Sequence, residues 1–316
     1  MIKKILLLAS LFFTLISFSQ KIDASLEHLR EGESVMMERA MPLPLGQRPS
    51  GFTQSDINKN SAEKDLTLRG NMTFIGNSNL NRNLKKTREA YEAIYPYLTF
   101  GFQNLSGITY TGDDNANVSF TEEVRLTYTN NGVTTPWVVP GNGQFYMDYV
   151  DIDGSVDENG DGKDDTFSSS SATLNLPNCS RVAYAGLYWA GVYPSEFWGN
   201  ATPRSNDYDK IKFKYPSSTA YKNITADEII YNVNEPYICF KDITTEVQAE
   251  ANPNGVYTAA NIRAIRGLAN GLGGASGWVM IVVYENDNES SKKFSVFDGF
   301  ATVRDGSPQE VKFTWF

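Results

Sequence analysis

Apolar and polar residues alternate along most of the chain after residue 66, and turn residues interrupt the alternation at short intervals. Because successive side chains of an extended chain point to opposite faces, each alternating run predicts a β-strand. Short strands separated by turns, with little helical periodicity between them, are typical of a β-sandwich. We therefore predict an all-β, jelly-roll-like sandwich from the runs LTLRGNMTFIG, ITYTG, NVSFTEEVRLTYTNNG, QFYMDYVDI, SATLNL, RVAYAGLYWAGV, KIKFKY, EIIYNV, YICFKDI, GWVMIVVYEN and KKFSVFDGFATV.

Several segments depart from simple alternation. Residues 277–285 (GWVMIVVYE) are apolar on both faces, which predicts a central, fully buried strand. The sequence NNG at residues 130–132 is a strong turn signal between two alternating runs. Residues 81–97 predict a helix, residues 258–268 are compatible with a strand or a short helix, and residues 270–277 predict a glycine-rich loop.

Residues 1–19 have the pattern of an export signal. Two lysines supply a positive start, and residues 5–16 form an apolar stretch too short to span a membrane as a stable helix. Small residues before Gln20 predict cleavage at that point. We expect an exported protein, at the cell surface or extracellular, whose mature domain is not inserted in a membrane.

The remainder divides into three parts. Residues 20–66 are polar and contain several prolines, which predicts a mixed N-terminal extension that is either flexible or docked on the main body. Residues 67–135 form a β-rich part, and residues 136–316 form the sandwich domain. Because the chain ends in the strand-like EVKFTWF without a closing turn, we expect it to be the front part of a longer polypeptide.

The charge balance narrows the range of partners. The chain has 28 Lys and Arg against 37 Asp and Glu, a formal net charge of −9 at pH 7. Such a chain repels nucleic-acid phosphates and anionic lipid headgroups, so neither is an expected partner. Cations, neutral glycans and other proteins remain compatible with it.

Residues that form the common catalytic sets are scarce. His28 is the single histidine and lies in the extension, which argues against a nucleophilic triad and against a histidine-rich metal site. No phosphate-binding loop or dinucleotide motif is present. Acidic residues cluster in turns, and for the exceptions, Asp298 and Glu285, hydrogen bonding is a simpler role than glycosidase catalysis. We expect no enzymatic activity.

An acidic stretch at residues 151–165 (DIDGSVDENGDGKDD) raises the question of a metal site. Its D-x-N-x-D-G-x-x-D spacing winds alternate oxygens around one point, and Gly162 stands where the sharp turn needs a positive φ. Ser168 occupies the position of the usual bidentate Glu, so an aspartate on the incoming strand has to complete the shell. We favour structural calcium over a merely solvated hairpin turn, with ligands from Asp153, Asp157, Asn159, Asp161, the carbonyl of Lys163, and Asp165.

Cys179 and Cys239 both lie in strand-like runs. In an oxidising compartment they could pair, and closing a loop of about 60 residues would stabilise the fold by roughly 4 kcal/mol. The alternative is two buried free thiols that act as small hydrophobic residues. The disulfide and the two free thiols are nearly equally compatible with the sequence. We expect the disulfide, because the protein is predicted to be exported.

Aromatic residues crowd the segment WAGVYPSEFWGN. Pro194 and Gly199 indicate a loop that presents Phe197 and Trp198, and such rings suit stacking on sugar faces. Core packing under the loop is the simpler alternative. Phe197 and Trp198 are therefore candidate ligand contacts.

An ordered series of motifs runs through roughly residues 140–305: YVDIDG, TFSSSSATLNLPNCSRVAYAGLYWAG, KIKFKYP, YKNITADEI, ICFKDITTEVQ, NGVYTAANI and GWVMIVVYENDNESSKKFSVFDGFATV. The series resembles a domain near the front of very large surface proteins of Bacteroidota, including gliding-motility adhesins of the SprB type secreted by the type IX system. The resemblance implies a β-sandwich, a cell-surface location, an adhesive or structural role without catalytic residues, and proteins of the type IX secretion and gliding machinery as partners. It does not imply calcium.

These observations lead to three functional hypotheses. The first is a non-catalytic cell-surface adhesin module for gliding motility or surface attachment, which contacts surface glycans or abiotic surfaces. The second is a secreted carbohydrate-binding module or polysaccharide-acting enzyme, which a glycan activity screen would reveal. The third is an assembly subunit that docks into a larger complex through residues 20–66.

Overall fold

The computed structural model describes seven stretches of the chain, in which strands dominate: residues 51–104, 124–136, 145–154, 165–193, 207–232, 236–268 and 275–300. Within these stretches the helices are α3 (Leu84–Ile94) and α4 (Thr244–Gln248). The predicted all-β class is therefore confirmed. The predicted signal peptide lies outside the described residues.

The described residues belong to two compact units. Unit 1 is drawn from Ser78–Ser170 and Arg263–Gly277, and unit 2 from Pro42–Asn77, Ser171–Ile262 and Trp278–Phe316. The units are thus interleaved along the sequence, whereas the predicted division at residue 135 was linear.

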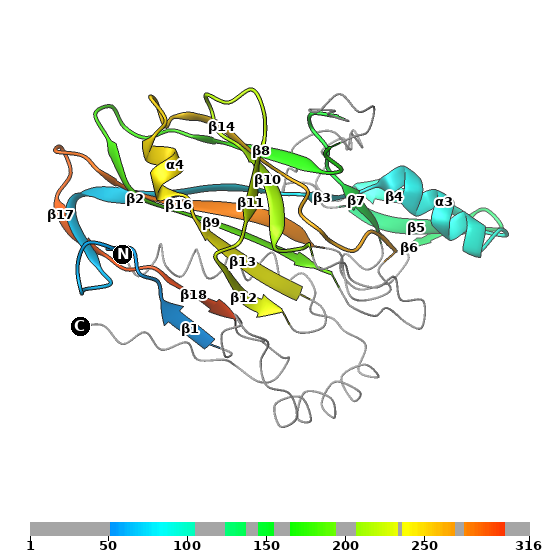
Figure 1. Ribbon diagram of the computed structural model, residues 1–316. Coiled ribbons are helices and arrows are strands. Elements are labelled where there is room, and N and C mark those ends of the chain that lie inside the picture. Colours follow the sequence, from blue (N-terminus) through cyan, green and yellow to red (C-terminus); the bar gives the residue numbers. More distant parts are fainter. Residues whose placement is uncertain are drawn as a thin grey trace. The chain divides into compact units, whose positions relative to one another are not determined.

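Unit 2 is built on two sheets (Figure 1). The four-stranded sheet has the order β11 (Lys222–Thr225), β10 (Lys210–Lys214), β14 (Gly255–Ala260) and β8 (Ser169–Leu174). The six-stranded sheet has the order β12 (Glu228–Asn232), β13 (Pro236–Asp242), β9 (Arg181–Val192), β16 (Ser276–Glu285), β2 (Leu66–Ser78) and β17 (Ser291–Phe294). Within them, β10 pairs antiparallel with β11 and β14, and β13 pairs antiparallel with β9 and β12.

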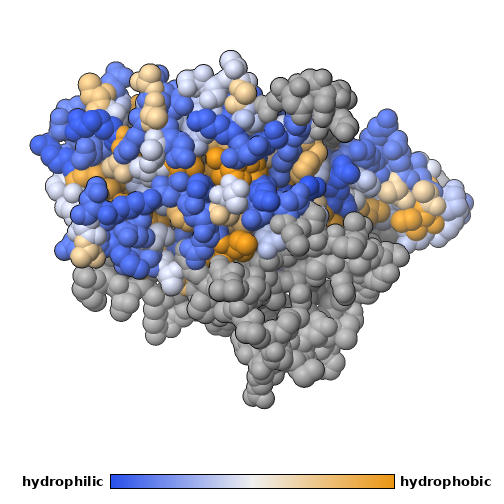
Figure 2. Space-filling view, in the orientation of Figure 1, coloured by the Kyte–Doolittle hydropathy of each residue, from blue (hydrophilic) through white to orange (hydrophobic). Residues whose placement is uncertain are grey.

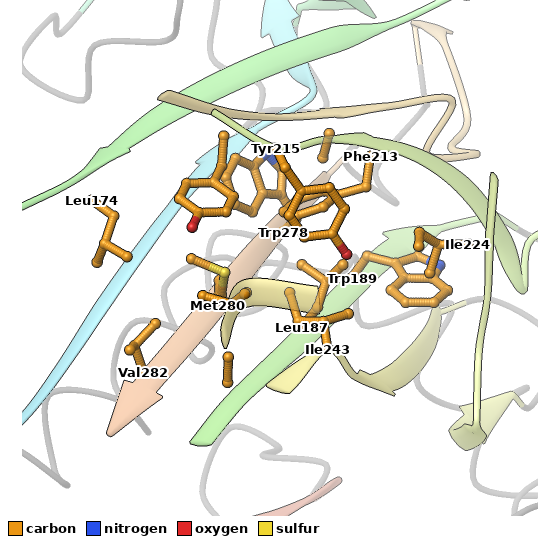
Figure 3. Close-up of a cluster of buried hydrophobic side chains, with 14 of the residues drawn as sticks. Leu174, Leu187, Trp189, Phe213, Tyr215, Ile224, Ile243, Trp278, Met280 and Val282 are labelled. Carbon is orange, nitrogen blue, oxygen red and sulfur yellow. The ribbon is translucent and has the colours of Figure 1, made fainter. Parts of the chain in front are cut away.

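Large apolar side chains fill the space between the two sheets. Leu187 and Trp189 come from the six-stranded sheet, and Leu174 and Phe213 come from the four-stranded sheet. Figure 3 shows Leu174 and Trp189 at opposite ends of this cluster, with Phe213 between them. Fully burying one such side chain stabilises the fold by about 1.5–3 kcal/mol, so this shared core holds the sheets face to face. The predicted sandwich is confirmed in unit 2.

Strand β16 is buried on both of its faces. Every residue from Ser276 to Tyr284 is buried, and the strand lies inside the six-stranded sheet between β9 and β2. Its side chains at Trp278, Met280 and Val282 join the core between the sheets. The alternate residues, such as Ile281, face the other side and are buried there as well. The prediction of a central, fully buried strand is confirmed.

A two-stranded ribbon lies on the outer side of the six-stranded sheet. It consists of β1 (Gly51–Gln54) paired antiparallel with β18 (Phe297–Phe300). In Figure 1 this ribbon lies on the side opposite to β14 and β10. KKFSVFDGFATV, predicted as one strand, is therefore divided between β17 and β18, because β17 pairs with β2 and β18 pairs with β1.

Residues 51–65, which we name the N-terminal strap, are docked on unit 2. The strap buries Ile57 and forms a salt bridge of 2.5 Å between Lys59 and Asp242. At its end, the Asp65 carboxylate accepts a hydrogen bond from Gln54 and pairs with Lys293 at 2.6 Å. Of the two alternatives for the extension, docking holds for this part. The glycines and prolines of residues 20–66 predict irregular structure for the whole extension. Gly51–Gln54 nevertheless forms a strand, because it pairs with β18.

Unit 1 contains two small sheets and a helix. The first sheet has the order β15 (Gly267–Leu268), β7 (Tyr146–Tyr149) and β3 (Leu80–Arg82), and the second has the order β4 (Thr99–Asn104), β5 (Val124–Asn130) and β6 (Val133–Pro136). Helix α3 begins after Asn83, whose side chain accepts a hydrogen bond from the backbone N–H of Lys86, as an N-cap residue does. The predicted helix is confirmed.

The turn between β5 and β6 follows its sequence signal. Asn131 and Gly132 both have positive φ, 48° and 78°, as a two-residue hairpin turn of the favoured hand requires. Residues 258–268, which were compatible with a strand or a helix, contribute to β14 and β15 and form no helix. Part of the predicted glycine-rich loop belongs instead to β16, which begins at Ser276.

Figure 2 shows hydrophilic residues over most of the described part of one face, with apolar residues scattered among them. In the part of the chain that the structure describes, no helix is long and apolar enough to cross a membrane.

Candidate functional site

The incoming side of the acidic turn brings two carboxylates to one hydroxyl. Asp151 follows β7 and forms a parallel bridge with Ser169, at the start of β8. The Ser169 hydroxyl lies 2.7 Å from Asp151 Oδ1 and also contacts Asp153 Oδ1. It accepts the backbone N–H of Ile152 at 2.9 Å, which fixes its position. A cation at this turn would relieve the repulsion between the two carboxylates.

The rest of the predicted calcium ligand set is only partly placed. Asp153 and Asp165 are among the described residues, whereas Asp157, Asn159, Asp161 and Lys163 lie outside them. Among the described residues no three His, Cys, Asp or Glu side chains are grouped so as to hold a metal ion. Calcium at this turn stays a prediction.

A cluster around β7 in unit 1 was not predicted from the sequence. The buried Asp148 carboxylate pairs with Lys86 from α3 and with Arg266, the latter at 3.3 Å. Each of these cations also lies over an aromatic ring, Lys86 over Tyr146 at 5.7 Å and Arg266 over Tyr149 at 5.1 Å from the ring centroid. Aromatic faces attract cations, so the rings and the carboxylate hold both side chains in place.

The same cluster extends to a second arginine. The Tyr149 and Phe167 rings lie 5.0 Å apart, and Arg263 lies over Phe167 at 4.7 Å. The Tyr149 hydroxyl donates to the carbonyl of Ala264 and accepts its N–H, which ties residues 263–266 to β7. The cluster joins α3, β7, Phe167 and residues 263–266, which are far apart in the sequence. No local sequence pattern predicts that they meet. These contacts tie α3, β7 and residues 263–266 together within unit 1.

The two cysteines are free thiols in the structure. Cys239 is buried in the core and pairs in register with Trp189, near the end of β9, whereas Cys179 is exposed and precedes the start of that strand at Arg181. Because a strand rises about 3.3 Å per residue, the distance along β9 far exceeds the roughly 7 Å limit between disulfide Cα atoms. The expected disulfide is not formed. The free-thiol alternative holds, except that Cys179 is not buried.

The carboxylates considered for a glycosidase have structural roles. Asp298 is buried and accepts hydrogen bonds from the hydroxyls of Ser55 at 2.7 Å and Tyr188 at 2.8 Å. Burial, with smaller contributions from the nearby Tyr184 and Asp298, raises the pKa of the Tyr188 hydroxyl well above its usual range, so it remains a donor. Glu285 instead pairs with Arg181 at 3.2 Å on the surface. Asp298 thereby fastens the N-terminal strap and β18 to β9.

The candidate ligand contacts Phe197 and Trp198 lie outside the described residues. Their neighbour Trp189 is a core residue, and its indole N–H donates to the carbonyl of Tyr208 at 3.0 Å.

Lysines occupy alternate positions of β10. Ile211 and Phe213 face the core, so the alternate residues Lys210, Lys212 and Lys214 share the other face of the four-stranded sheet. We name these three residues the lysine stripe. The pattern is visible in the sequence as KIKFK, because alternate residues of a strand share a face.

Comparisons of the chain with protein-family models, with curated proteins and with solved structures found no match.

Proposed function

We propose that the protein is a non-catalytic module of the cell surface that attaches cells to glycans or abiotic surfaces, as part of a larger exported adhesin. The proposal includes the location and the partners that the resemblance implies, namely the type IX secretion and gliding machinery. The observation that carries it is the two-sided burial of β16, which supports a rigid scaffold suited to transmitting force.

The form of the scaffold supports this proposal. One side of the six-stranded sheet is packed on the four-stranded sheet, and the other side carries the ribbon of β1 and β18. Side chains packed on both faces leave the strands of this sheet little freedom to move within unit 2. The loops and outer faces are then the parts available for contact with a partner.

The acidic turn has a supporting role in the proposal. Calcium held by Asp153, Asp165 and the predicted loop residues would rigidify the connection between β7 and β8. The convergence of Asp151 and Asp153 on Ser169 favours this role, because two like charges at one hydroxyl gain stability from a cation.

Retention under flow tests the proposed attachment. Beads coated with the exported protein should be retained on glycan-coated or bare polymer surfaces. The double variant Phe197→Ala/Trp198→Ala should fold normally by circular dichroism and bind the glycan at least about tenfold more weakly, which corresponds to roughly 1.4 kcal/mol. The matched control is Tyr97→Ala, which removes an aromatic ring that is 71% exposed elsewhere, and it should bind as the wild type does.

The same experiment separates the alternatives. Sugar released from a mixed-glycan panel would overturn the non-catalytic assignment and indicate a polysaccharide-acting enzyme. Binding to glycans without retention on any surface would indicate a secreted carbohydrate-binding module. A double variant that adheres as well as the wild type would remove Phe197 and Trp198 from the contact surface.

A further inference from the structure

We infer that the N-terminal strap and residues 295–300, which together we name the latch, form a force-released element of unit 2. Tension between the two ends of the chain peels the latch away and lengthens the module, while both sheets of unit 2 stay folded. This inference rests on the proposed attachment function, because an adhesin in use carries tension along its chain. It assigns the part of the molecule that yields first.

The direction of strand pairing determines how tension acts on the ribbon. Strands β1 and β18 are antiparallel, and Gly51 is opposite Phe300. The chain continues toward its N-terminus from Gly51 and toward its C-terminus from Phe300, so tension enters the ribbon at one end. Hydrogen bonds between antiparallel strands run perpendicular to the strands. Tension applied at this end therefore loads the bonds one after another, and the ribbon opens from Gly51 toward Gln54.

The rest of the described structure is sheltered from this tension. Leu66, at the start of β2, is opposite Phe294, at the end of β17. The other strands of the two large sheets and every described segment of unit 1 lie between these two residues in the sequence. While the pair of Leu66 and Phe294 holds, tension between the chain ends does not extend the segments between them. The latch is therefore the first part to yield.

The pair of Leu66 and Phe294 resists opening more strongly than the ribbon does. Strand β2 lies between β16 and β17 in the six-stranded sheet, whereas β1 and β18 form a sheet of two strands (Figure 1). Phe294 is buried, and so is Leu68, two residues along β2. Opening this part of the sheet moves apolar side chains from a packed interior into water. Peeling consequently stops at Leu66 and Phe294.

A few side-chain contacts hold the latch closed. The Ser55 hydroxyl donates to the buried Asp298 carboxylate at 2.7 Å, and Lys59 pairs with Asp242 at 2.5 Å. The apolar side chain of Ile57 is buried between these two contacts along the chain. Hydrogen bonds and ion pairs are lost once their atoms are more than about 4 Å apart. These contacts therefore set a threshold force, and little resistance remains once they have opened.

Release of the latch has a defined mechanical consequence. Peeling frees residues 51–65 and 295–300, which at about 3.3–3.6 Å per residue add roughly 70 Å to the contour length. It also separates Asp298 from Tyr188, a buried residue whose hydroxyl donates to that carboxylate at 2.8 Å. Both freed segments stay covalently joined to the six-stranded sheet, so the ribbon re-forms when the tension falls. The module thus yields to a sudden pull without losing its core.

Optical tweezers test the inference on the chain that follows the predicted export signal. DNA handles are joined by a ligase to short peptide tags at both ends, in a Cys179→Ser background that removes the exposed thiol. The trace should show a first step of roughly 70 Å in contour length, at a lower force than the opening of the sheets. This step should reverse on relaxation. A chain that opens in one event, without an earlier step, would overturn the inference.

A disulfide across the ribbon tests whether the latch produces the first step. Residues directly opposite in an antiparallel pair have Cα atoms about 4.5–5.5 Å apart, which is within the range of a disulfide. Oxidised Gly51→Cys/Phe300→Cys should lose the first step and regain it with a reductant. The matched control is Lys210→Cys/Thr225→Cys, an opposite and exposed pair on β10 and β11, which should keep the step. A step that survives the ribbon disulfide would contradict the assignment.

Removing two of the side-chain contacts tests the threshold. Ser55→Ala/Lys59→Gln should lower the force of the first step and leave the force of the main opening unchanged. An unchanged first step in this variant would also count against the latch. These results are independent of attachment: a latch that opens as expected in a protein whose beads no surface retains would leave the latch standing and end the proposed function. Retained beads without a first step would have the opposite meaning.

Discussion

At the scale of single residues, two glycines set how closely β2 and β16 approach. A Cβ built at Gly70 would lie within 3.0 Å of the backbone of Tyr284, and one built at Gly76 would lie within 3.0 Å of the backbone of Trp278. Real Cβ atoms essentially never make such contacts, and backbone cannot move aside as a flexible side chain can. Glycine is therefore required at both positions by the packing of the neighbouring strand.

We predict that Gly76→Ala lowers the free energy of unfolding by about 1–3 kcal/mol, because the added methyl group forces β2 away from β16. Urea unfolding followed by fluorescence measures this loss. Gly101→Ala is the control, since its Cβ would meet only the Thr127 hydroxyl at 3.4 Å. Equal stability of the two variants would contradict the close approach.

At the scale of elements, the acidic turn and the N-terminal strap show how a loop gains order. The turn has its Asp151 and Asp153 side chains gathered at Ser169, whereas the strap is fixed by a strand pairing and by carboxylates at Asp65 and Asp242. The strap needs only protein partners. The turn concentrates negative charge, and we propose that a bound cation stabilises it.

We predict that a chelator lowers the thermal midpoint and that calcium restores it. With about 10 mM calcium and a Kd of about 10⁻⁴–10⁻³ M, mass action stabilises the folded chain by about 1.4–2.7 kcal/mol. Differential scanning calorimetry with and without EDTA measures the shift. Asp157→Asn/Asp161→Asn should respond to neither reagent. A wild-type midpoint that EDTA leaves unchanged would remove the site.

At the scale of the whole molecule, two ionised carboxylates link stability to pH. Desolvation raises the pKa of Asp65, but hydrogen bonds and charge attraction from Lys293, with hydrogen bonds from Ser295 and Gln54, outweigh it and hold that pKa below its usual value of 3.8. For Asp242, desolvation is likewise outweighed by Lys59 and the Thr244 N–H, so its pKa is also lowered. Both groups fasten the strap in their charged form.

A lowered folded-state pKa means that the unfolded chain binds protons first as the pH falls. The stabilisation is therefore fully present above about pH 4 and is lost as the pH falls through the lower folded values. We predict that Asp65→Asn/Asp242→Asn lowers the thermal midpoint at pH 7 and makes its decline below pH 4 shallower. Glu63→Gln, which removes a strap carboxylate without a salt bridge in the described structure, is the control. Parallel pH profiles of the wild type and the double variant would refute this link.

The sequence by itself determined the all-β class, the buried character of β16, helix α3 and the hairpin turn at Asn131-Gly132. Each of these follows from local physics: the period of apolar residues, the Asn83 cap, and the freedom of Asn and Gly to adopt a positive φ. The lysine stripe also has a local signal, because alternate residues of a strand share a face.

Only the tertiary structure decided the interleaved units, the docking of the strap, the separation of Cys179 from Cys239 and the cluster around Asp148. Each of these features depends on which distant segments of the chain meet. A pattern of apolar residues determines which face of a strand is buried, but it does not determine which strand lies next to it. Sequence showed that both faces of β16 would be covered. Which strands cover them was settled by packing, because burial is a property of all neighbours together.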